Sequence, residues 1–259
     1  MNEGLKQLLR TVQTNFPYLL DAKITLMRMC RNVFRVPAER DFSAIRLFPF
    51  PDDALFLDVG ANRGQSTDAI RMHRKNCRIW LFEPNTLLHD KLERQFRQDA
   101  RVTVNKFGLG DGRGGRVLYV PLYKKWIFDG LSSFDEENAR GWLKNNIYRY
   151  RDRYLSIREL PCRIEVLDDL HLDPAFIKLD IQGWELSALR GGEQTIRTYE
   201  PVLLIESPGE AVLKYLAGMG YEYFAFRNGV FVANAQGDVN TFFMTKRTSF
   251  RVKQYIREY

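Results

Sequence analysis

Cysteine is scarce in this chain of 259 residues, which contains only three. Cys30, Cys77 and Cys162 are far apart and odd in number, so the sequence indicates neither a disulfide framework nor a paired-cysteine metal site. No apolar run approaches the length of a membrane span. Lys6 and Arg10 interrupt the apolar pattern near the start, which argues against a signal peptide. These absences favour a cytoplasmic protein.

The glycine fingerprint of dinucleotide-binding proteins, G-x-G-x-x-G, is incomplete here. Residues 54–58 form a short apolar run that ends in Asp58, which is typical of a buried parallel strand. Gly60 and Gly64 follow, but Asn62 stands where the fingerprint needs its second glycine. Glycine allows positive φ and the close approach of a ligand, while a carboxylate at the strand end repels a pyrophosphate. The turn therefore favours a cationic ligand such as S-adenosylmethionine over NAD.

A second strand pattern, at residues 78–82, ends in Glu83 and Pro84. Glu83 lies about 20 residues after the glycine turn, where an acidic side chain can bind both hydroxyls of a ribose. Ser66 and Thr67 are good N-cap residues, so a helix is expected to begin there. Strand, glycine turn and helix form the ligand crevice of an open α/β sheet. The alternative is an ordinary strand-turn-helix with a surface glutamate.

Three short blocks carry more information together than any one alone. They read D-V-G-A-N-x-G-x-x-T at 58–67, F-E-P at 82–84 and K-x-D-x-Q-G-x-E at 178–185. In this order they closely resemble the FkbM family of S-adenosylmethionine-dependent methyltransferases, and the resemblance runs from about residue 54 to about 247. It implies methyl transfer, most often to a hydroxyl of a sugar or polyketide. The family more often has glutamate where this chain has Gln182.

The cofactor-binding candidates come from the glycine turn, from the ends of the second and third strands, and from the third block. The third strand is expected at 102–109, and the loop after it commonly flanks the adenine in this fold type. The full set of candidates is Asp58, Gly60, Ala61, Asn62, Gly64, Gln65, Ser66, Thr67, Glu83, Pro84, Asn105, Gly108, Leu109, Asp180 and Gln182.

The catalytic candidates are two carboxylates at the ends of predicted neighbouring strands, 176–181 and 201–206. Asp180 and Glu206 would meet at the rim of the crevice. They either bind Mg²⁺ as oxygen ligands, or one is a general base, or Asp180 only orients the loop backbone. His171 is a further candidate base. Gln182 cannot ionise and would orient its neighbours, while Lys178 is expected to pair with a carboxylate.

The net charge of +7 favours acidic partners. Residues 122–160 mix aromatic side chains with Arg149, Arg151 and Arg153, and Asp152 is the only acid between Arg140 and Arg158. Such a segment suits a sugar ring or an anionic acceptor, and a helical excursion with a solvated basic face is the alternative. Residues 1–50 are expected to form a helical cap with a basic face. Peripheral contact with a membrane is the alternative role for that cap.

Alternating strands and helices predict an α/β, Rossmann-like methyltransferase fold, in which a mostly parallel sheet is flanked by helices. A C-terminal antiparallel hairpin is expected around Asn228-Gly229. Residues 1–50 form the cap, and residues 51–259 form the S-adenosylmethionine-binding domain with an insert at about 122–160. The expected function is O-methylation of a carbohydrate, glycan or small metabolite, with Mg²⁺ as an optional cofactor. An RNA methyltransferase and a non-catalytic nucleoside-binding module are the alternatives. Nucleic acid is disfavoured because no Asn-Pro-Pro-Tyr motif is present, and no oligomeric state follows from the sequence.

Overall fold

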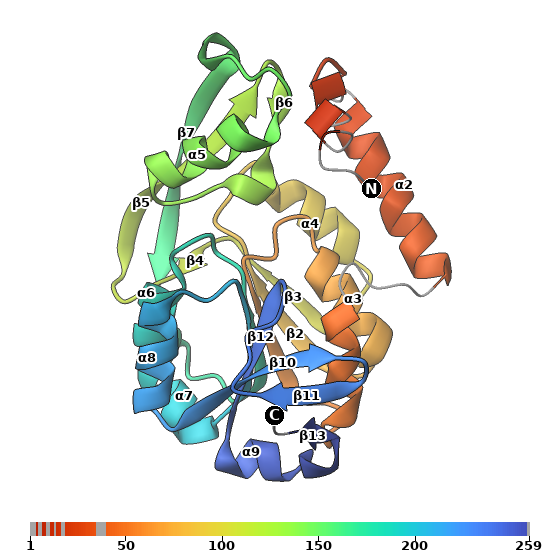
Figure 1. The fold of residues 1–259 in the computed structure, drawn as a ribbon, viewed down its shortest axis with the longest axis vertical. Coiled ribbons are helices and arrows are strands. Elements are labelled where there is room, and N and C mark those ends of the chain that lie inside the picture. The colour runs from red at the N-terminus through yellow and green to blue at the C-terminus, as the bar shows by residue number, and fades with distance from the viewer. Residues whose placement is uncertain are drawn as a thin grey trace.

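The structure, a computed structural model, describes residues 40–257 without a gap, residues 19–34, and positions 4, 7, 8, 11, 12 and 14–16. A large sheet flanked by helices forms the lower part of the molecule, and a smaller sheet rises above it (Figure 1). Residues 5–16 were expected to form the first helical stretch of the cap, and five of these twelve positions lie outside the described residues. The second stretch, expected at 24–34, lies within helix α2 (Leu19–Phe34). Within the described residues, no helix has the length and apolarity needed to cross a membrane.

The large sheet contains nine strands in the order β13-β11-β10-β12-β9-β8-β1-β2-β3. Five neighbouring strands run parallel: β1 (Leu55–Val59), β2 (Arg78–Phe82), β3 (Val102–Asn105), β8 (Pro174–Leu179) and β9 (Val202–Glu206). The remainder is the predicted antiparallel end of the sheet: β10 (Tyr221–Arg227), β11 (Val230–Ala233) and β12 (Asn240–Thr245), with β13 (Ile256–Arg257) at the edge. The strand order reverses between β1 and β8, which is where such sheets bind ligands at their carboxyl ends.

Helices cover both faces of this sheet and bury most of β1, β8 and β9, whereas the edge strand β3 is partly exposed. One face carries the 3-10 helix η1 (Arg40–Leu47), α3 (Gln65–His73) and α4 (His89–Phe96), and the other carries α6 (Glu185–Arg190), α7 (Glu193–Tyr199) and α8 (Glu210–Gly218). Phe56 of β1 packs with Ile45 and Ile70, while Leu57 faces the other way toward Leu189 and Leu216. Burial on both faces explains the continuous apolar runs in these strands. The predicted Rossmann-like α/β fold is therefore confirmed.

The smaller sheet is a larger unit than the predicted insert. It consists of β4 (Gly108–Leu109), β5 (Gly114–Tyr123), β6 (Trp126–Ile127) and β7 (Leu155–Glu165), in the order β4-β7-β5-β6. β5 and β7 form one long antiparallel ladder from the pair Gly114↔Ile164 to the pair Tyr123↔Leu155. Residues 116–121, whose sequence alternates like a hairpin strand, lie on one side of this ladder, and residues 163–164 lie on the other. The smaller sheet spans residues 108–165 and includes the expected insert at about 122–160.

The aromatic side chains of this unit form its own core. Tyr123 is buried and stacks on Tyr150 at 5.3 Å between ring centroids, and Leu143 of α5 (Glu136–Asn146) packs in the same cluster. The guanidinium groups of Arg149 and Arg153 lie over two rings of the same segment, the exposed Tyr148 and the partly buried Tyr154. These contacts favour a structural role for the aromatic and basic residues of the segment over a role in acceptor binding.

Candidate active site

The turn after β1 is organised by a buried carboxylate. Ser66 Oγ and Thr67 Oγ1 donate to Asp58 Oδ2 at 2.7 and 2.5 Å, so these hydroxyls do not cap the helix as expected. The N-cap of α3 is Gly64, which makes no side-chain capping bond. Asp58 Oδ1 is buried and has no hydrogen-bond partner within the described part of the chain. One acceptor at this strand end is therefore available to an N–H group or a water held by a ligand.

The two glycines of the turn have positive φ, +80° at Gly60 and +76° at Gly64, as their positions predicted. Their missing side chains make room for the protein itself rather than for a ligand. A Cβ at Gly60 would lie 1.9 Å from the Asp180 carbonyl oxygen, and one at Gly64 would meet the Phe96 ring at 2.8 Å. The turn after β1 and the loop after β8 are thus in direct backbone contact.

Glu83 ties the ends of β1 and β2 together. Its Oε2 accepts the backbone N–H of Asn62 at 2.7 Å, and its Oε1 accepts that of Asn85 at 2.8 Å. Each carboxylate oxygen keeps a second acceptor position, which a ribose hydroxyl can use. Burial raises the pKa of Glu83 to about 7, although the two backbone N–H groups oppose that rise.

Asp180 lies just beyond β8 in a network with Lys178, Gln182 and Glu206. Lys178 Nζ, almost fully buried, donates to Asp180 Oδ2 at 3.0 Å, which confirms the predicted pairing of this lysine. Gln182 Nε2 donates to Asp180 Oδ1 at 2.8 Å and to Glu206 Oε2 at 3.1 Å. Burial alone would raise the pKa of Asp180. The Lys178 ammonium and the hydrogen bonds to Asp180 outweigh burial and hold that pKa well below its usual range.

The loop after β8 is shaped by Glu185. Its Oε1 accepts the backbone N–H groups of Ile181 and Gly183 at 3.1 and 3.2 Å. The chain turns sharply between them, with φ of +52° at Gln182 and +94° at Gly183. Glu185 thus explains the last position of the K-x-D-x-Q-G-x-E block, because it fixes the loop that presents Gln182.

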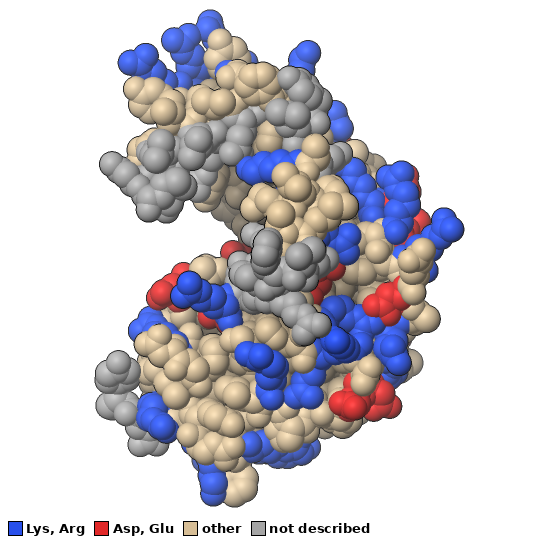
Figure 2. Space-filling view, turned by 90° about the vertical axis from the view of Figure 1, so that its right-hand side faces the viewer, with Lys and Arg blue, Asp and Glu red and all other residues tan. Residues whose placement is uncertain are grey.

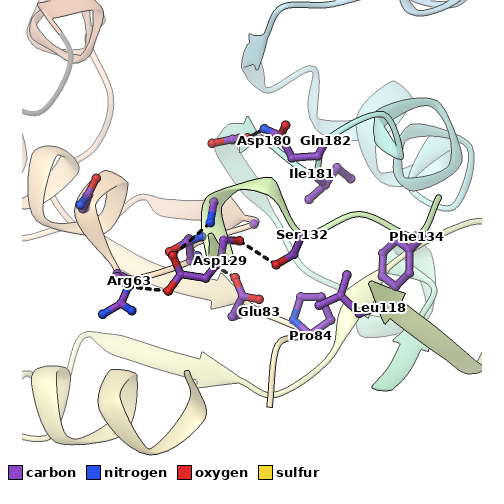
Figure 3. Close-up of a pocket in the computed structure, with 14 residues that line it drawn as sticks. Arg63, Glu83, Pro84, Leu118, Asp129, Ser132, Phe134, Asp180, Ile181 and Gln182 are labelled. Atoms are coloured by element: carbon purple, nitrogen blue, oxygen red, sulfur yellow. Dashed lines mark hydrogen bonds and ion pairs between the residues drawn. The ribbon is translucent and has the colours of Figure 1, made fainter. Parts of the chain in front are cut away.

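A cavity of about 250 Å³ opens at the carboxyl ends of β1, β2 and β8 (Figure 3). Glu83 and Pro84 lie on one side, and Asp180, Ile181 and Gln182 lie on the other. The smaller sheet contributes the remaining wall with Leu118, Asp129, Gly130, Ser132 and Phe134. The cavity is therefore built jointly by both sheets.

An ion pair between Arg63 and Asp129 joins the two sheets. Neither residue was among the site residues predicted from the sequence. Arg63 Nε lies 2.6 Å from Asp129 Oδ2, and the side chains are only 10% and 12% exposed. Burial raises the pKa of Asp129, and the guanidinium of Arg63 opposes that shift. No local motif marks this pair, because its members are 66 positions apart in the chain. Only the closure of the smaller sheet over the glycine turn brings them together.

The structure brings part of the predicted set of cofactor-binding and catalytic residues together around this cavity. The cavity is lined by Gly60, Asn62, Gln65, Glu83, Pro84, Asp180 and Gln182, while the lining does not include Asp58, Ala61, Gly64, Ser66, Thr67, Asn105, Gly108, Leu109, Glu206 or His171. Asn105 Nδ2 donates to the Leu81 carbonyl at 3.1 Å, and Gly108 and Leu109 form β4 in the smaller sheet. Their expected place beside an adenine therefore has no counterpart in the cavity lining.

His171 lies at the wrong end of its strand for a catalytic base. It follows η4 (Leu167–Leu170) and precedes β8, whereas Asp180 follows the other end of β8. Six residues of extended strand span about 20 Å. The structure therefore does not bring this histidine to the cavity.

The Asp180–Glu206 pair does not fit a magnesium site. Within the described residues, no three His, Cys, Asp or Glu side chains form a group that could hold a metal ion. Both oxygens of Asp180 already accept hydrogen bonds, one from an ammonium and one from an amide. A divalent cation would have to displace these donors and lie beside the Lys178 charge, which costs electrostatic free energy.

Comparison with known proteins identifies the family. The model of the Methyltransferase FkbM domain matches residues 58–223. The AMB antimetabolite synthetase AmbE of Pseudomonas aeruginosa is 29% identical over 165 residues, which is 54% of this chain and 8% of that protein. The structure of methyltransferase FkbM from Methylobacillus flagellatus KT covers 79% of this chain at 23% identity and a TM-score of 0.49.

A precorrin-6y C5,15-methyltransferase from Geobacter metallireducens GS-15 covers 80% of the chain at 12% identity and a TM-score of 0.41. The chain spans 48% of the length of the Methylobacillus protein and far less of AmbE. The family match covers well over half of the chain and includes the glycine turn, Glu83 and Asp180. The chain belongs to the FkbM family of methyltransferases.

Proposed function

We propose that the protein transfers a methyl group from S-adenosylmethionine to a hydroxyl of a carbohydrate or another small metabolite. The observation that carries this proposal is that one cavity is lined by Glu83, which follows β2, by Asp180, which follows β8, and by Gly60. In this arrangement Glu83 accepts hydrogen bonds from the ribose hydroxyls. The methionine part of the cofactor extends along the glycine turn toward Asp180. Pro84, Leu118 and Phe134 give the adenine an apolar wall.

The charge of the cavity supports this cofactor over a dinucleotide. Glu83, Asp129 and Asp180 line it, against the single cation of Arg63. S-adenosylmethionine carries a sulfonium and an ammonium, which such a surface attracts, whereas a pyrophosphate would be repelled. The buried, unpartnered Asp58 Oδ1 adds a further acceptor at the same edge of the sheet.

Methyl transfer to a hydroxyl is an in-line displacement on the methyl carbon. The acceptor oxygen forms the new C–O bond, the S–C bond breaks, and its electron pair stays on sulfur as S-adenosylhomocysteine leaves. The hydroxyl proton becomes strongly acidic as its oxygen is alkylated, so a weak base is sufficient to remove it. Asp180, kept ionised by Lys178 and hydrogen-bonded with Glu206, is placed to accept that proton. Alignment of the two reactants in the cavity contributes the rest of the rate.

The proposal is tested by binding and turnover on the whole chain. Calorimetry should give micromolar or tighter binding of S-adenosylhomocysteine and none of NAD. Incubation of S-adenosylmethionine with a library of sugars and hydroxylated metabolites should then release S-adenosylhomocysteine and a methyl ether. Binding without turnover on any acceptor would favour the nucleoside-binding alternative, and NAD binding without a response to either sulfur compound would refute the proposal.

A further inference from the structure

Helix α2 presents apolar side chains to solvent. Thr25 and Arg28 line a cavity between α2, α3 and α4, and Arg28 is bound there by Asp68 of α3. Leu26 and Met29 are instead 63% and 60% exposed. Residues three positions apart lie on one face of a helix, so Leu26 and Met29 form one apolar patch. In its described part, α2 therefore turns polar side chains toward the protein and apolar ones toward solvent.

Exposed apolar side chains are concentrated near the start of the chain. Among the described residues, half of the large apolar side chains that are exposed lie between positions 8 and 29: Leu8, Val12, Phe16, Leu26, Met27 and Met29. A single exposed apolar residue is ordinary on a protein surface, whereas an apolar patch is typical of a surface that binds another molecule. The outward face of α2 is therefore a candidate docking surface.

The surface around α2 is positively charged. Figure 2 shows that Lys and Arg side chains predominate over acidic ones on the face that carries α2. A cavity of about 570 Å³ on this face, to which α2 contributes one residue, is lined by four cations against two carboxylates: Arg28, Arg71, Lys75 and Arg101 against Asp68 and Asp99. Lys75 and Arg101 are exposed. The net charge of this lining has the same sign as the net charge of the whole chain, which is +7.

The combination of apolar surface and positive charge favours one occupant. In a two-fold dimer each copy would present this same positive surface to the other, and like charges repel. A nucleic acid would bind the cations but leave Leu26 and Met29 in water. A bilayer with anionic lipids satisfies both features, because its headgroups attract cations and its interface accepts apolar side chains.

We propose that the outward face of α2 docks on a membrane surface that contains anionic lipids. Leu26 and Met29 enter the interface between headgroups and acyl chains, and Lys75 and Arg101 lie against the headgroups. The inner side of α2 lines a cavity that shares three lining residues with the cofactor cavity. Docking therefore brings the cofactor cavity close to the bilayer. The inference does not depend on the proposed methyl transfer.

The test is a titration of the full chain with lipid vesicles, read out by flotation. The wild-type protein should bind vesicles that contain phosphatidylglycerol and should not bind vesicles of phosphatidylcholine alone. Its affinity should fall as salt is added, because exposed charges are screened over about 8 Å at physiological ionic strength. A wild-type protein that does not bind the phosphatidylglycerol vesicles at low salt would overturn the inference.

Two double variants separate the apolar contribution from the charged one. Leu26→Gln/Met29→Gln should weaken vesicle binding at least about tenfold, because the variant loses apolar area that the interface buries. Lys75→Gln/Arg101→Gln should weaken binding about 10- to 30-fold, since each basic residue near an anionic surface contributes roughly fivefold. All four side chains are exposed, so both variants should fold like wild type.

Matched control variants change other parts of the surface. Val239→Gln/Phe250→Gln removes two exposed apolar side chains from the C-terminal part of the chain. Arg190→Gln/Lys214→Gln removes two exposed cations from α6 and α8, which lie on the opposite face of the large sheet from α3 and α4. Both controls should bind vesicles like wild type, and a loss equal to that of the α2 variant or the Lys75/Arg101 variant would overturn the inference.

Light scattering and RNA binding test the other occupants. A dimer that dissociates in Leu26→Gln/Met29→Gln, without vesicle binding by wild type, would overturn the inference in favour of a second copy. Binding of a short RNA that is lost only in Lys75→Gln/Arg101→Gln, again without vesicle binding, would overturn it in favour of nucleic acid. Affinity for S-adenosylhomocysteine should stay at the wild-type level in all four variants, so failure of the docking surface and failure of the proposed function are distinguishable.

Discussion

Asp180 is the single residue on which the proposed chemistry most depends. Asp180→Asn removes the negative charge but keeps the shape of the side chain, so kcat should fall by about 10²–10⁴, the usual contribution of a general base, while cofactor affinity is kept. Steady-state kinetics and calorimetry measure the two effects. Turnover should also survive a chelator, because Lys178 and Gln182 already occupy the Asp180 oxygens.

An exposed carboxylate at the opposite edge of the sheet, Asp52, serves as the control for that substitution. Asp52→Asn should leave kcat and cofactor affinity unchanged. Near-normal kcat in both Asp180→Asn and Glu206→Gln would remove the carboxylate pair from the chemistry and leave positioning alone as the source of the rate. Loss of activity on chelation would instead support a bound metal ion.

Glu83 should make cofactor binding depend on pH. In the free protein burial raises the pKa of Glu83 to about 7, so below that pH the side chain holds a proton. Ribose hydroxyls donate to the carboxylate, so binding releases this proton, and affinity should fall about tenfold per pH unit below pH 7 and level off above it. Calorimetry of S-adenosylhomocysteine between about pH 5.5 and 8.5 tests this.

Glu83→Gln keeps the size of the side chain but cannot ionise, so its affinity should be independent of pH over the same range. Its affinity should also be weaker by about 1–3 kcal/mol above pH 7, the scale of hydrogen bonds to a charged group. A wild-type affinity that does not change with pH would show that the ribose does not use this carboxylate.

At the scale of elements, the contact between η2 (Asp129–Leu131) and the glycine turn should couple the two sheets. Asp129→Ala leaves the mostly buried Arg63 guanidinium without its carboxylate, which costs about 3–5 kcal/mol when a buried pair is broken. The double variant Arg63→Ala/Asp129→Ala should cost less than the sum of the single variants. Urea unfolding of all four proteins gives the coupling free energy.

The exposed i,i+4 pair Arg140–Glu136 on α5 provides the comparison, and its coupling should be about 0.3–0.5 kcal/mol. If the Arg63–Asp129 cycle gave no more coupling than this surface pair, the ion pair would not hold the sheets together.

The parallel strands could be predicted from the sequence because their determinants are local. β1, β2, β8 and β9 are short apolar runs with Asp58, Glu83, Asp180 and Glu206 at or next to their carboxyl ends, so both their positions and the edge they share were predictable. The smaller sheet was not predictable in the same way. β5 and β7 pair across more than thirty intervening residues, and the sequence pattern of neither strand identifies the strand with which it pairs.

The same distinction between local and long-range determinants applies to the residues of the site. Glu83 and Asp180 follow strands, and their roles were predicted from position alone. The Arg63–Asp129 pair depends on how the smaller sheet packs on the larger one, which no local pattern encodes. The third strand, expected to run to residue 109, ends at Asn105, and His171 precedes β8 rather than following it, so neither residue lines the cavity.

For the whole molecule, cofactor binding should raise the unfolding temperature, because the cavity wall comes from both sheets. A ligand at about 100 times its Kd stabilises the native state by about 2.7 kcal/mol. In a chain of this size that corresponds to a rise of roughly 5–10 °C. Differential scanning fluorimetry with S-adenosylhomocysteine measures the shift, and NAD at the same concentration is the control. Equal shifts with both ligands would argue against a selective site.

The 1.9 Å separation found for a Cβ at Gly60 has a consequence for engineering this protein. The glycine turn after β1 and the loop that carries Asp180 are in contact through their backbones. A library that diversifies residues 180–183 will therefore mostly return variants with weaker cofactor affinity. Directed evolution toward new acceptors should therefore leave the carboxyl edge of β1 and β8 untouched.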